Sequence, residues 1–281
     1  GAMSESPSGS LSGALLLIGC GKMGGALLSG WLKRGIKAEQ VHIVDPFLDQ
    51  VKAAFDGEAL HYYSRIADLP ATLRPALVLL AVKPQMMDQV MASLAAIVDR
   101  DTLFLSIAAG KTLDYFQQHL GAEALVVRAM PNTPAAVGRG MTVLVAKAGV
   151  RDDQKALCAD LLRAVGEVAW VEDEELINPV TALSGGGPAY VFLLIETLAQ
   201  AGVAAGLPAE LAMRLARTTV AGAGELVQQS DQPAATLRQN VTSPNGTTLE
   251  ALKVLMADDG LQPLMTKAIA AASNRSRELA G

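Results

Sequence analysis

A glycine-rich segment near the start of the chain has the residue types and spacing of a phosphate-binding loop. Residues 19–24 match GxGxxG, directly after the apolar run 14–18 and directly before a helical pattern. In that context the three glycines allow a tight turn, close approach of the backbone to a pyrophosphate, and close helix–strand packing. We therefore predict a dinucleotide here, next to the free N–H groups of a helix start; the alternative is a glycine turn without a nucleotide. The predicted contacts are Gly19, Gly21, Lys22, Met23 and Gly24.

A carboxylate stands at the end of the second apolar run, 41–44. Asp45 lies about 20 residues beyond the glycine motif, where an acidic side chain accepts from the ribose 2′-hydroxyl and repels a 2′-phosphate. This favours NADH over NADPH. Two alternatives stay open: Asp45 starts a turn before Pro46, or the downstream cations Lys52 and Arg65 serve a 2′-phosphate.

Three further apolar runs, 76–82, 102–107 and 125–129, end in loops of chemical interest. In open α/β sheets, ligands bind outside the carboxyl ends of the strands. The small residues 108–110 admit a flat ring, and Asn132 offers an amide to a nicotinamide carboxamide or a ribose. The alternative for Asn132 is a turn capped by its side chain. The cofactor residues predicted from these loops are Val82, Lys83, Pro84, Ala108, Ala109, Gly110 and Asn132.

A turn followed by a helical pattern also occurs late in the chain, at 243–248. Its sequence SPNGTT places Pro, Asn and Gly directly before a helix that starts at Thr247. The first N–H groups of such a helix are unpaired and bind a carboxylate without any arginine. From the residues alone, an ordinary capped helix start explains the segment equally well.

The elements that must position these residues follow two patterns. Up to about residue 171, strands of four to seven residues alternate with amphipathic helices, which indicates parallel βαβ units and a doubly wound α/β sheet. The helices expected there are 23–33, 85–98 and 152–165, and the last expected strand is 141–146. Afterwards the pattern is helical, with segments at 174–183, 188–205, 209–228, 247–257 and 261–279. We expect a tag remnant and disordered lead-in over 1–12, a Rossmann-like dinucleotide-binding domain over 13–172, and an all-α domain over 173–281.

The expected helical domain, 173–281, is too apolar to be stable in water without a partner. Helices that are apolar on every face must be buried on every face, so we expect this domain to pack against a second copy of the chain. The stretch 190–207 is long enough to suggest a membrane span, but it carries Glu196 and Gln200. A buried helix of a soluble protein is the favoured interpretation.

The composition excludes several other classes of function. The formal net charge of −5, with no basic block, argues against nucleic acid as a partner. Two cysteines and three histidines without metal-ligand spacing argue against a disulfide framework and against a metal site. No signal peptide pattern precedes the first strand, so we expect a cytoplasmic protein with no membrane contact.

Taken together, the motifs resemble the pyrroline-5-carboxylate reductase family over nearly the whole chain from Leu15 on. The most specific is the Ser-Pro-x-Gly-Thr-Thr segment, which is rare outside that family. Asn245 stands where glycine is common, and Gly186 replaces the usual small hydroxyl residue. The pair Asp45-Pro46 differs from that often seen in NADPH-preferring members, which puts the cofactor preference in doubt. The segments that carry the resemblance are Gly19–Gly24, Ala81–Pro84, Ser106–Gly110, Arg128–Pro134, Ser184–Tyr190 and Val241–Thr248.

The resemblance implies an enzyme of proline biosynthesis. Hydride would pass from NADPH or NADH to the C=N bond of 1-pyrroline-5-carboxylate, giving L-proline. The resemblance also implies a homodimer through the helical domain, with a decamer of five dimers as the larger assembly. Thr248 would be the catalytic residue, approaching the ring nitrogen. The residues implied to hold the substrate carboxylate, facing the nicotinamide, are Ser243, Gly246, Thr247 and Thr248.

Three alternatives share this plan: an imine reductase with another substrate, a 3-hydroxyacid dehydrogenase, and a non-catalytic NAD(P)H-binding sensor. Hydroxyacid enzymes generally need a lysine acid–base in the helical domain. Lys253 and Lys267 are the only lysines after Lys155, and neither lies in a recognisable catalytic segment. A sensor would leave segment 243–248 unexplained, so the reductase is the favoured interpretation.

Overall fold

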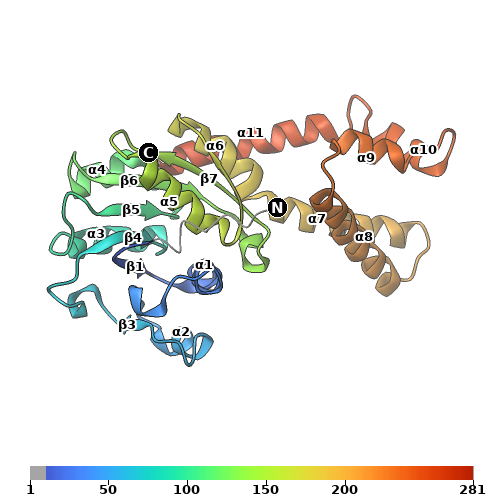
Figure 1. Ribbon diagram of the computed structural model, residues 1–281. Helices are drawn as coiled ribbons and strands as arrows, with labels where there is room; N and C mark the ends of the chain where they lie inside the picture. The colour runs from blue at the N-terminus through green and yellow to red at the C-terminus, as the bar shows by residue number, and fades with distance from the viewer. Residues whose placement is uncertain (1–10, 281) are drawn as a thin grey trace. The chain divides into compact units, whose positions relative to one another are not determined.

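The computed structural model describes residues 11–280 (Figure 1). By contacts, these residues form two compact units, one up to Gly185 and again from Ser273 on, the other Gly186–Ala272. Most of the expected lead-in, residues 1–10, lies outside the described residues. Leu11 is buried, and its carbonyl accepts a hydrogen bond from Gln40 Nε2 at 2.7 Å. The expected domain boundary at 172/173 stays a prediction.

The first unit is built on one eight-stranded sheet with the order β3-β2-β1-β4-β5-β6-β7-β8. Its first six strands are parallel, and β7 runs antiparallel to β6. The chain reverses order after β3 and crosses to β4 beside β1, which is the doubly wound arrangement expected from the sequence. The strands are β1 (Ala14–Ile18), β2 (Val41–Val44), β3 (His61–Tyr63), β4 (Pro75–Leu80), β5 (Leu103–Ser106), β6 (Leu125–Met130), β7 (Gly140–Ala146) and β8 (Gly166–Trp170).

Both faces of the sheet are covered by helices. Leu15 and Leu17 of β1 pack on one face against a core that includes Trp31 of α1 (Gly21–Lys33) and Leu161 of α5 (Asp152–Arg163). Alternate residues of the same strand face a second core, to which α3 (Met87–Leu94) and α4 (Leu113–Leu120) contribute. Because both faces are buried, the central strands are continuous apolar runs. That is why they could be located from the sequence.

The remaining elements of this unit differ from expectation. β3, β8, α4 and the short α2 (Leu48–Ala54) were not predicted. β8 carries three exposed residues out of five, so it lacks the continuous apolar run of the central strands. The expectation of purely parallel units was wrong for β7. Only a short turn, the 3-10 helix Thr133–Val137, connects β6 to β7, and a parallel crossover needs a dozen or more residues.

The second unit is entirely helical among the described residues. α7 and α8 pack on each other as a pair, and α11 begins in this unit and ends in the first. α9 falls in a stretch that the sequence left without an element. The helices are α7 (Gly187–Ala204), α8 (Ala209–Gln229), α9 (Ala234–Asn240), α10 (Thr247–Leu255) and α11 (Leu261–Ala280).

The apolar helix α7 is largely uncovered within this chain. Phe192 is 60% exposed and Leu193 56%. The continuous helical run Glu174–Ala204 is long and apolar enough to cross a membrane, and only 11% of its most apolar window is buried. Length and composition alone are weak evidence for a span, because helices of soluble proteins pass the same test. The expected burial of this helix is therefore not achieved inside one chain.

Candidate active site

The glycine loop after β1 has the geometry of a dinucleotide cradle. Gly19 has a φ of +81°, and a Cβ there would lie 2.9 Å from Val82 Cγ1. Gly21 has a φ of +51°, but a Cβ there would meet no atom within 4 Å, so open space lies beyond it. A Cβ on Gly24 would approach the Gly19 carbonyl oxygen to 3.3 Å. Thus both backbone conformation and packing favour glycine at Gly19, space at Gly24 is tight, and Gly21 leaves room for a phosphate.

The start of α1 supplies the donors for such a group. No side chain caps this helix, and its first turn contains no acidic residue. The first N–H groups therefore remain available, and the helix dipole favours an anion at this end. Lys22 is exposed in the same turn, and Met23 is half-buried. The residues of the loop fit a pyrophosphate.

The other predicted cofactor loops lie at the same edge of the sheet. Backbone hydrogen bonds link the strand ends in sequence: Gly19 N donates to Val44 O, Ala81 N to Ile18 O, and Ile107 N to Leu80 O. The carboxyl ends of β1, β2, β4 and β5 are therefore aligned. The residues that follow these ends are brought together at this edge: Gly19–Gly24, Asp45, Val82, Lys83, Pro84, Ala108, Ala109 and Gly110.

Asp45 is 7% exposed and connects two loops of this edge. Its Oδ2 accepts from Cys20 N at 2.8 Å, and its Oδ1 accepts from Phe47 N at 2.7 Å. Both donors are backbone N–H groups, so each carboxylate oxygen holds one loop in place. A pocket beside it is lined by loop and α2 residues that include Lys22 and Gln50. Asp45 thus shapes the phosphate loop as well as the predicted ribose position.

The thiol of Cys20 lies in the middle of this loop. Burial and the neighbouring Asp45 charge raise the pKa of Cys20 to about 11. The thiol is therefore protonated at neutral pH and is a poor nucleophile. Cys20 serves here as a small apolar side chain, and its backbone N–H rather than its sulfur takes part in the site.

The two cations proposed as alternatives for a 2′-phosphate have other contacts. Lys52 Nζ lies 5.5 Å from the centre of the Tyr62 ring, and Arg65 donates to Asp68 at 3.0 Å. Neither residue lines the pocket beside Asp45. Lys52 lines a neighbouring pocket with Pro46, Phe47 and Ser64, whereas Arg65 lines neither pocket. Of the two cations, Lys52 is therefore the one placed beside the loop that follows Asp45.

The side chain of Asn132 makes two hydrogen bonds within the first unit. Its Oδ1 accepts from Met141 N at 2.8 Å, and its Nδ2 donates to Ser184 O at 3.0 Å. The side chain therefore joins the loop after β6 to β7 and to the wide helical turn η7 (Thr181–Gly185). One amide hydrogen is left for a ligand, so a contact between Asn132 and the cofactor stays a prediction.

The 243–248 segment forms a turn that leads into α10. Gly246 N donates to Ser243 O at 3.1 Å, and Asn245 has a φ of +60°, the one positive value of a non-glycine residue among the described residues. Asn tolerates this left-handed conformation. No side chain caps α10, and Ser243, Thr247 and Thr248 are exposed. The segment therefore presents hydroxyls and unpaired N–H groups to solvent.

A buried ion pair in the first unit was missed in the sequence. Arg128 Nη1 lies 3.0 Å from Glu174 Oε2, and the side chains are 3% and 28% exposed. The two residues are far apart in the chain and match no spacing rule, although a charged residue inside the apolar run of β6 was a signal. Among residues 11–280, no group of three His, Cys, Asp or Glu side chains could hold a metal ion.

Comparison with known proteins gives the family. A family model described as pyrroline-5-carboxylate reductase dimerisation matches residues 174–279, and one described as NADP oxidoreductase, coenzyme F420-dependent, matches residues 14–110. The pyrroline-5-carboxylate reductase of Pseudomonas aeruginosa is 41% identical over 267 residues, which are 95% of this chain and 96% of that protein.

Solved structures agree over the same length. The pyrroline-5-carboxylate reductase of Coxiella burnetii is similar with a TM-score of 0.88 at 36% identity, covering 96% of this chain and 100% of that one. The pyrroline carboxylate reductase of Plasmodium falciparum, solved with NADP bound, is similar with a TM-score of 0.76 at 31% identity. The match covers 95% of this chain and 98% of that one. With an NAD(P)-binding sheet followed by a helical dimerisation region, the chain belongs to the pyrroline-5-carboxylate reductase family of NAD(P)-dependent oxidoreductases.

Proposed function

We propose that this chain reduces 1-pyrroline-5-carboxylate to L-proline through the loops described above. The observation that carries the proposal is the pair of uncapped helix starts. One follows the glycine loop and fits a pyrophosphate, and the other follows the 243–248 turn and fits a small carboxylate. An enzyme for this reaction needs one anion site for the cofactor and one for the substrate. Membership of the family agrees with that requirement.

The glycine loop and the start of α1 would hold the dinucleotide, whose nicotinamide C4 would supply the hydride for the imine carbon. The chain supplies placement. The N–H groups at the start of α10 hold the substrate carboxylate, with the hydroxyls of Ser243 and Thr247 beside them. Catalysis by positioning needs no strong acid or base, because protonation of the ring nitrogen already makes the imine electrophilic.

Thr248 is proposed as the catalytic residue. It is the second residue of α10, and its side chain is exposed. Its hydroxyl both donates and accepts, so it can orient the ring nitrogen before and after that nitrogen gains a proton. Gly246 keeps the turn tight, since a Cβ there would approach Ser243 O to 3.2 Å.

We further propose a preference for NADH. Asp45 places a buried negative charge at the end of β2, where it accepts from a ribose hydroxyl and repels a 2′-phosphate. The proposed cofactor contacts are Asn132 and the residues that follow the aligned carboxyl ends of β1, β2, β4 and β5. The NADP bound to the Plasmodium falciparum protein shows that this family also includes a protein that binds the phosphorylated cofactor.

The helical region is proposed as the dimerisation and substrate domain of a cytoplasmic homodimer. A dimerisation family model matches residues 174–279, and α7 has exposed apolar side chains that a second copy would cover. A decamer of five dimers is the larger assembly to be tested. Light scattering on the purified protein distinguishes the dimer from the decamer by mass.

The test is steady-state oxidation of NADH and of NADPH with 1-pyrroline-5-carboxylate. Loss of one hydrogen bond to a charged group predicts a roughly tenfold to hundredfold lower kcat/KM for Thr248→Ala. Thr248→Ser keeps the hydroxyl and should retain most of the activity. Binding of both cofactors without any turnover would contradict the proposal. Turnover that Thr248→Ala leaves unchanged would remove Thr248 from the catalytic role.

A further inference from the structure

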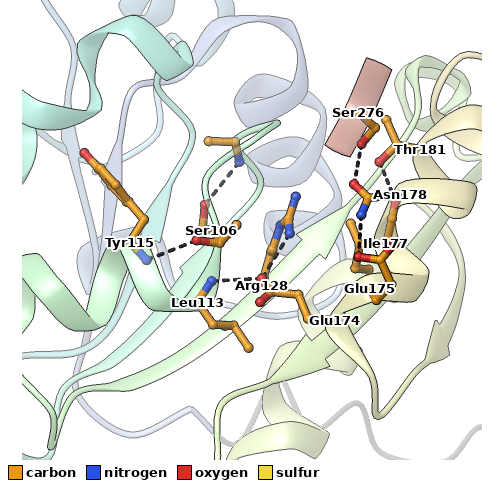
Figure 2. Close-up of polar contacts among 12 residues, drawn as sticks. Ser106, Leu113, Tyr115, Arg128, Glu174, Glu175, Ile177, Asn178, Thr181 and Ser276 are labelled. Atoms are coloured by element: carbon orange, nitrogen blue, oxygen red, sulfur yellow. Dashed lines mark hydrogen bonds and ion pairs between the residues drawn. The ribbon is translucent and has the colours of Figure 1, made fainter. Parts of the chain in front are cut away.

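The start of α4 is held by a carboxylate from far along the chain. Leu113 is the first residue of this helix, and its backbone N–H donates to Glu174 Oε2 at 2.8 Å (Figure 2). Thr112 caps the same helix by accepting from Tyr115 N at 3.1 Å. Glu174 therefore supplies the partner for an N–H that the helix itself cannot satisfy, and its charge suits the positive end of the dipole.

Glu174 is in turn fixed by a buried cation. Arg128 projects from β6 and is almost fully buried, and its Nη1 contacts the same Glu174 oxygen at 3.0 Å (Figure 2). The Nε of Arg128 has no hydrogen-bond partner among the described residues. A buried guanidinium with an unsatisfied N–H depends strongly on its carboxylate partner. The position of Glu174 is thus set by the sheet.

The loop between β5 and α4 is what this arrangement holds in place. It runs from Ile107 to Thr112 and contains the proposed nicotinamide-side residues Ala108–Gly110. At its first end, Ile107 N donates to Leu80 O at 3.1 Å and Ala108 N to Ser106 Oγ at 3.2 Å. At its other end, Leu113 N donates to Glu174 Oε2, a long-range contact, and at Gly110 the loop lies beside the Leu279 carbonyl of α11. We expect the loop to change its path if the contact to Glu174 is lost.

Glu174 is also the first residue of the region that matches the dimerisation family model, 174–279. The neighbouring Glu175 forms an ion pair with Arg277. Ser276 Oγ donates to Asn178 Oδ1 at 2.7 Å (Figure 2). The beginning and the end of the dimerisation region therefore meet in one polar network. Glu174, next to Glu175 in the sequence, makes its own separate contact to Leu113 at the end of the 107–112 loop.

We propose that Glu174 is a positioning residue for hydride transfer. It sets the path of the 107–112 loop and thereby the position of the nicotinamide. Glu174 itself lies at the start of the dimerisation region. This inference rests on the proposed function. It predicts that loss of the hydrogen bond between Leu113 N and Glu174 slows the hydride step, while the glycine loop still binds the cofactor. A purely structural role would instead lower stability and leave the hydride step of the folded enzyme unchanged.

A substitution at Leu113 isolates the hydrogen bond. Leu113→Pro removes the N–H at a helix position where proline is well tolerated, and Thr112 before it already has the extended conformation that proline requires. Leu113→Ala loses a similar part of the side chain but keeps the N–H. The two variants differ mainly in the contact to Glu174.

The experiment measures kcat, the KM for each substrate, and the kinetic isotope effect with cofactor deuterated at C4. We expect kcat of Leu113→Pro to be roughly 10- to 100-fold below that of Leu113→Ala, with a larger isotope effect and a cofactor KM within about twofold. Glu174→Gln should show the same signature, and Glu172→Gln, at an exposed neighbouring glutamate, should behave as the unmodified enzyme. Equal rates for the two Leu113 variants, or rates that follow only melting temperature, would overturn the inference. An unmodified enzyme without turnover would contradict the proposed function, and this inference with it.

Discussion

Asp45 Oδ2 accepts a hydrogen bond from the backbone N–H of Cys20 at 2.8 Å, which joins the end of β2 to the centre of the phosphate loop. One carboxylate thereby shapes the loop that receives the pyrophosphate and places negative charge where the ribose is expected. The residue proposed to disfavour a 2′-phosphate therefore also holds the glycine loop in its conformation.

Replacing Asp45 should change which cofactor is preferred. Asp45→Asn removes the negative charge but keeps one carbonyl oxygen for the backbone donors. We expect the NADH-to-NADPH ratio of kcat/KM to fall by about tenfold or more, since hydrogen bonds to charged groups contribute about 1.5–3 kcal/mol. Steady-state rates with both cofactors provide the measurement, and Asp49→Asn on α2 is the control. A ratio that does not change in Asp45→Asn would assign the preference to other residues.

Gly21 allows the phosphate contact to be separated from backbone strain. Gly21 and Gly35 both have positive φ, +51° and +101°, and a Cβ at either position meets no protein atom within 4 Å. Gly21→Ala and Gly35→Ala should both cost stability, by about 1 kcal/mol. Only Gly21→Ala should weaken NADH binding, by tenfold or more, because its methyl group enters the space left for the pyrophosphate. Fluorescence titration with NADH and thermal unfolding test the pair, and equal affinities would argue against the proposed phosphate position.

Removing Glu174 should destabilise the fold far more than removing an exposed partner. Glu174→Ala leaves Arg128 buried without its countercharge, at a cost of about 3 kcal/mol or more. Glu250→Ala breaks the exposed ion pair with Lys253 and should cost about 0.5 kcal/mol or less. Urea unfolding of the two variants measures the difference. Similar midpoints would mean that the Arg128 site relaxes or admits water.

A pair of histidines on the neighbouring strands β2 and β3 makes the stability of the fold depend on pH. His42 stacks on His61 with ring centres 4.4 Å apart, and burial together with that neighbour lowers the pKa of His42. The folded protein binds this proton less tightly than the unfolded chain does. Stability from His42 is therefore present above its unfolded pKa of about 6.5 and is lost as pH falls below it.

Melting temperatures between pH 8 and pH 5 measure this loss. His42→Phe keeps an aromatic ring beside His61 but cannot gain a proton, so its melting temperature should fall less over that range. His119→Phe, on α4, leaves the stacked pair intact and should follow the unmodified protein. A pH dependence that His42→Phe retains in full would assign the effect to other groups.

Much of the fold and of the cofactor edge could be predicted from local patterns. β1 and β2 have the predicted bounds because each is a short apolar run ended by a turn residue. The glycine loop was recognisable because its conformation depends on the glycines themselves, two of which have positive φ. The same reasoning failed for β3 and β8, whose short or exposed sequences give no comparable signal.

The sequence by itself determined the doubly wound sheet, the phosphate loop, the carboxylate at the end of β2 and the turn before α10. Each of these depends on neighbouring residues and on backbone preferences that act over a few positions. Only the tertiary structure decided that β7 is antiparallel, that Asn132 joins β7 to the wide turn at Ser184, and that Glu174 links Arg128 to Leu113. These are contacts between residues far apart in the chain. Their partners are chosen by packing and by the need to satisfy buried polar groups, which no local pattern encodes.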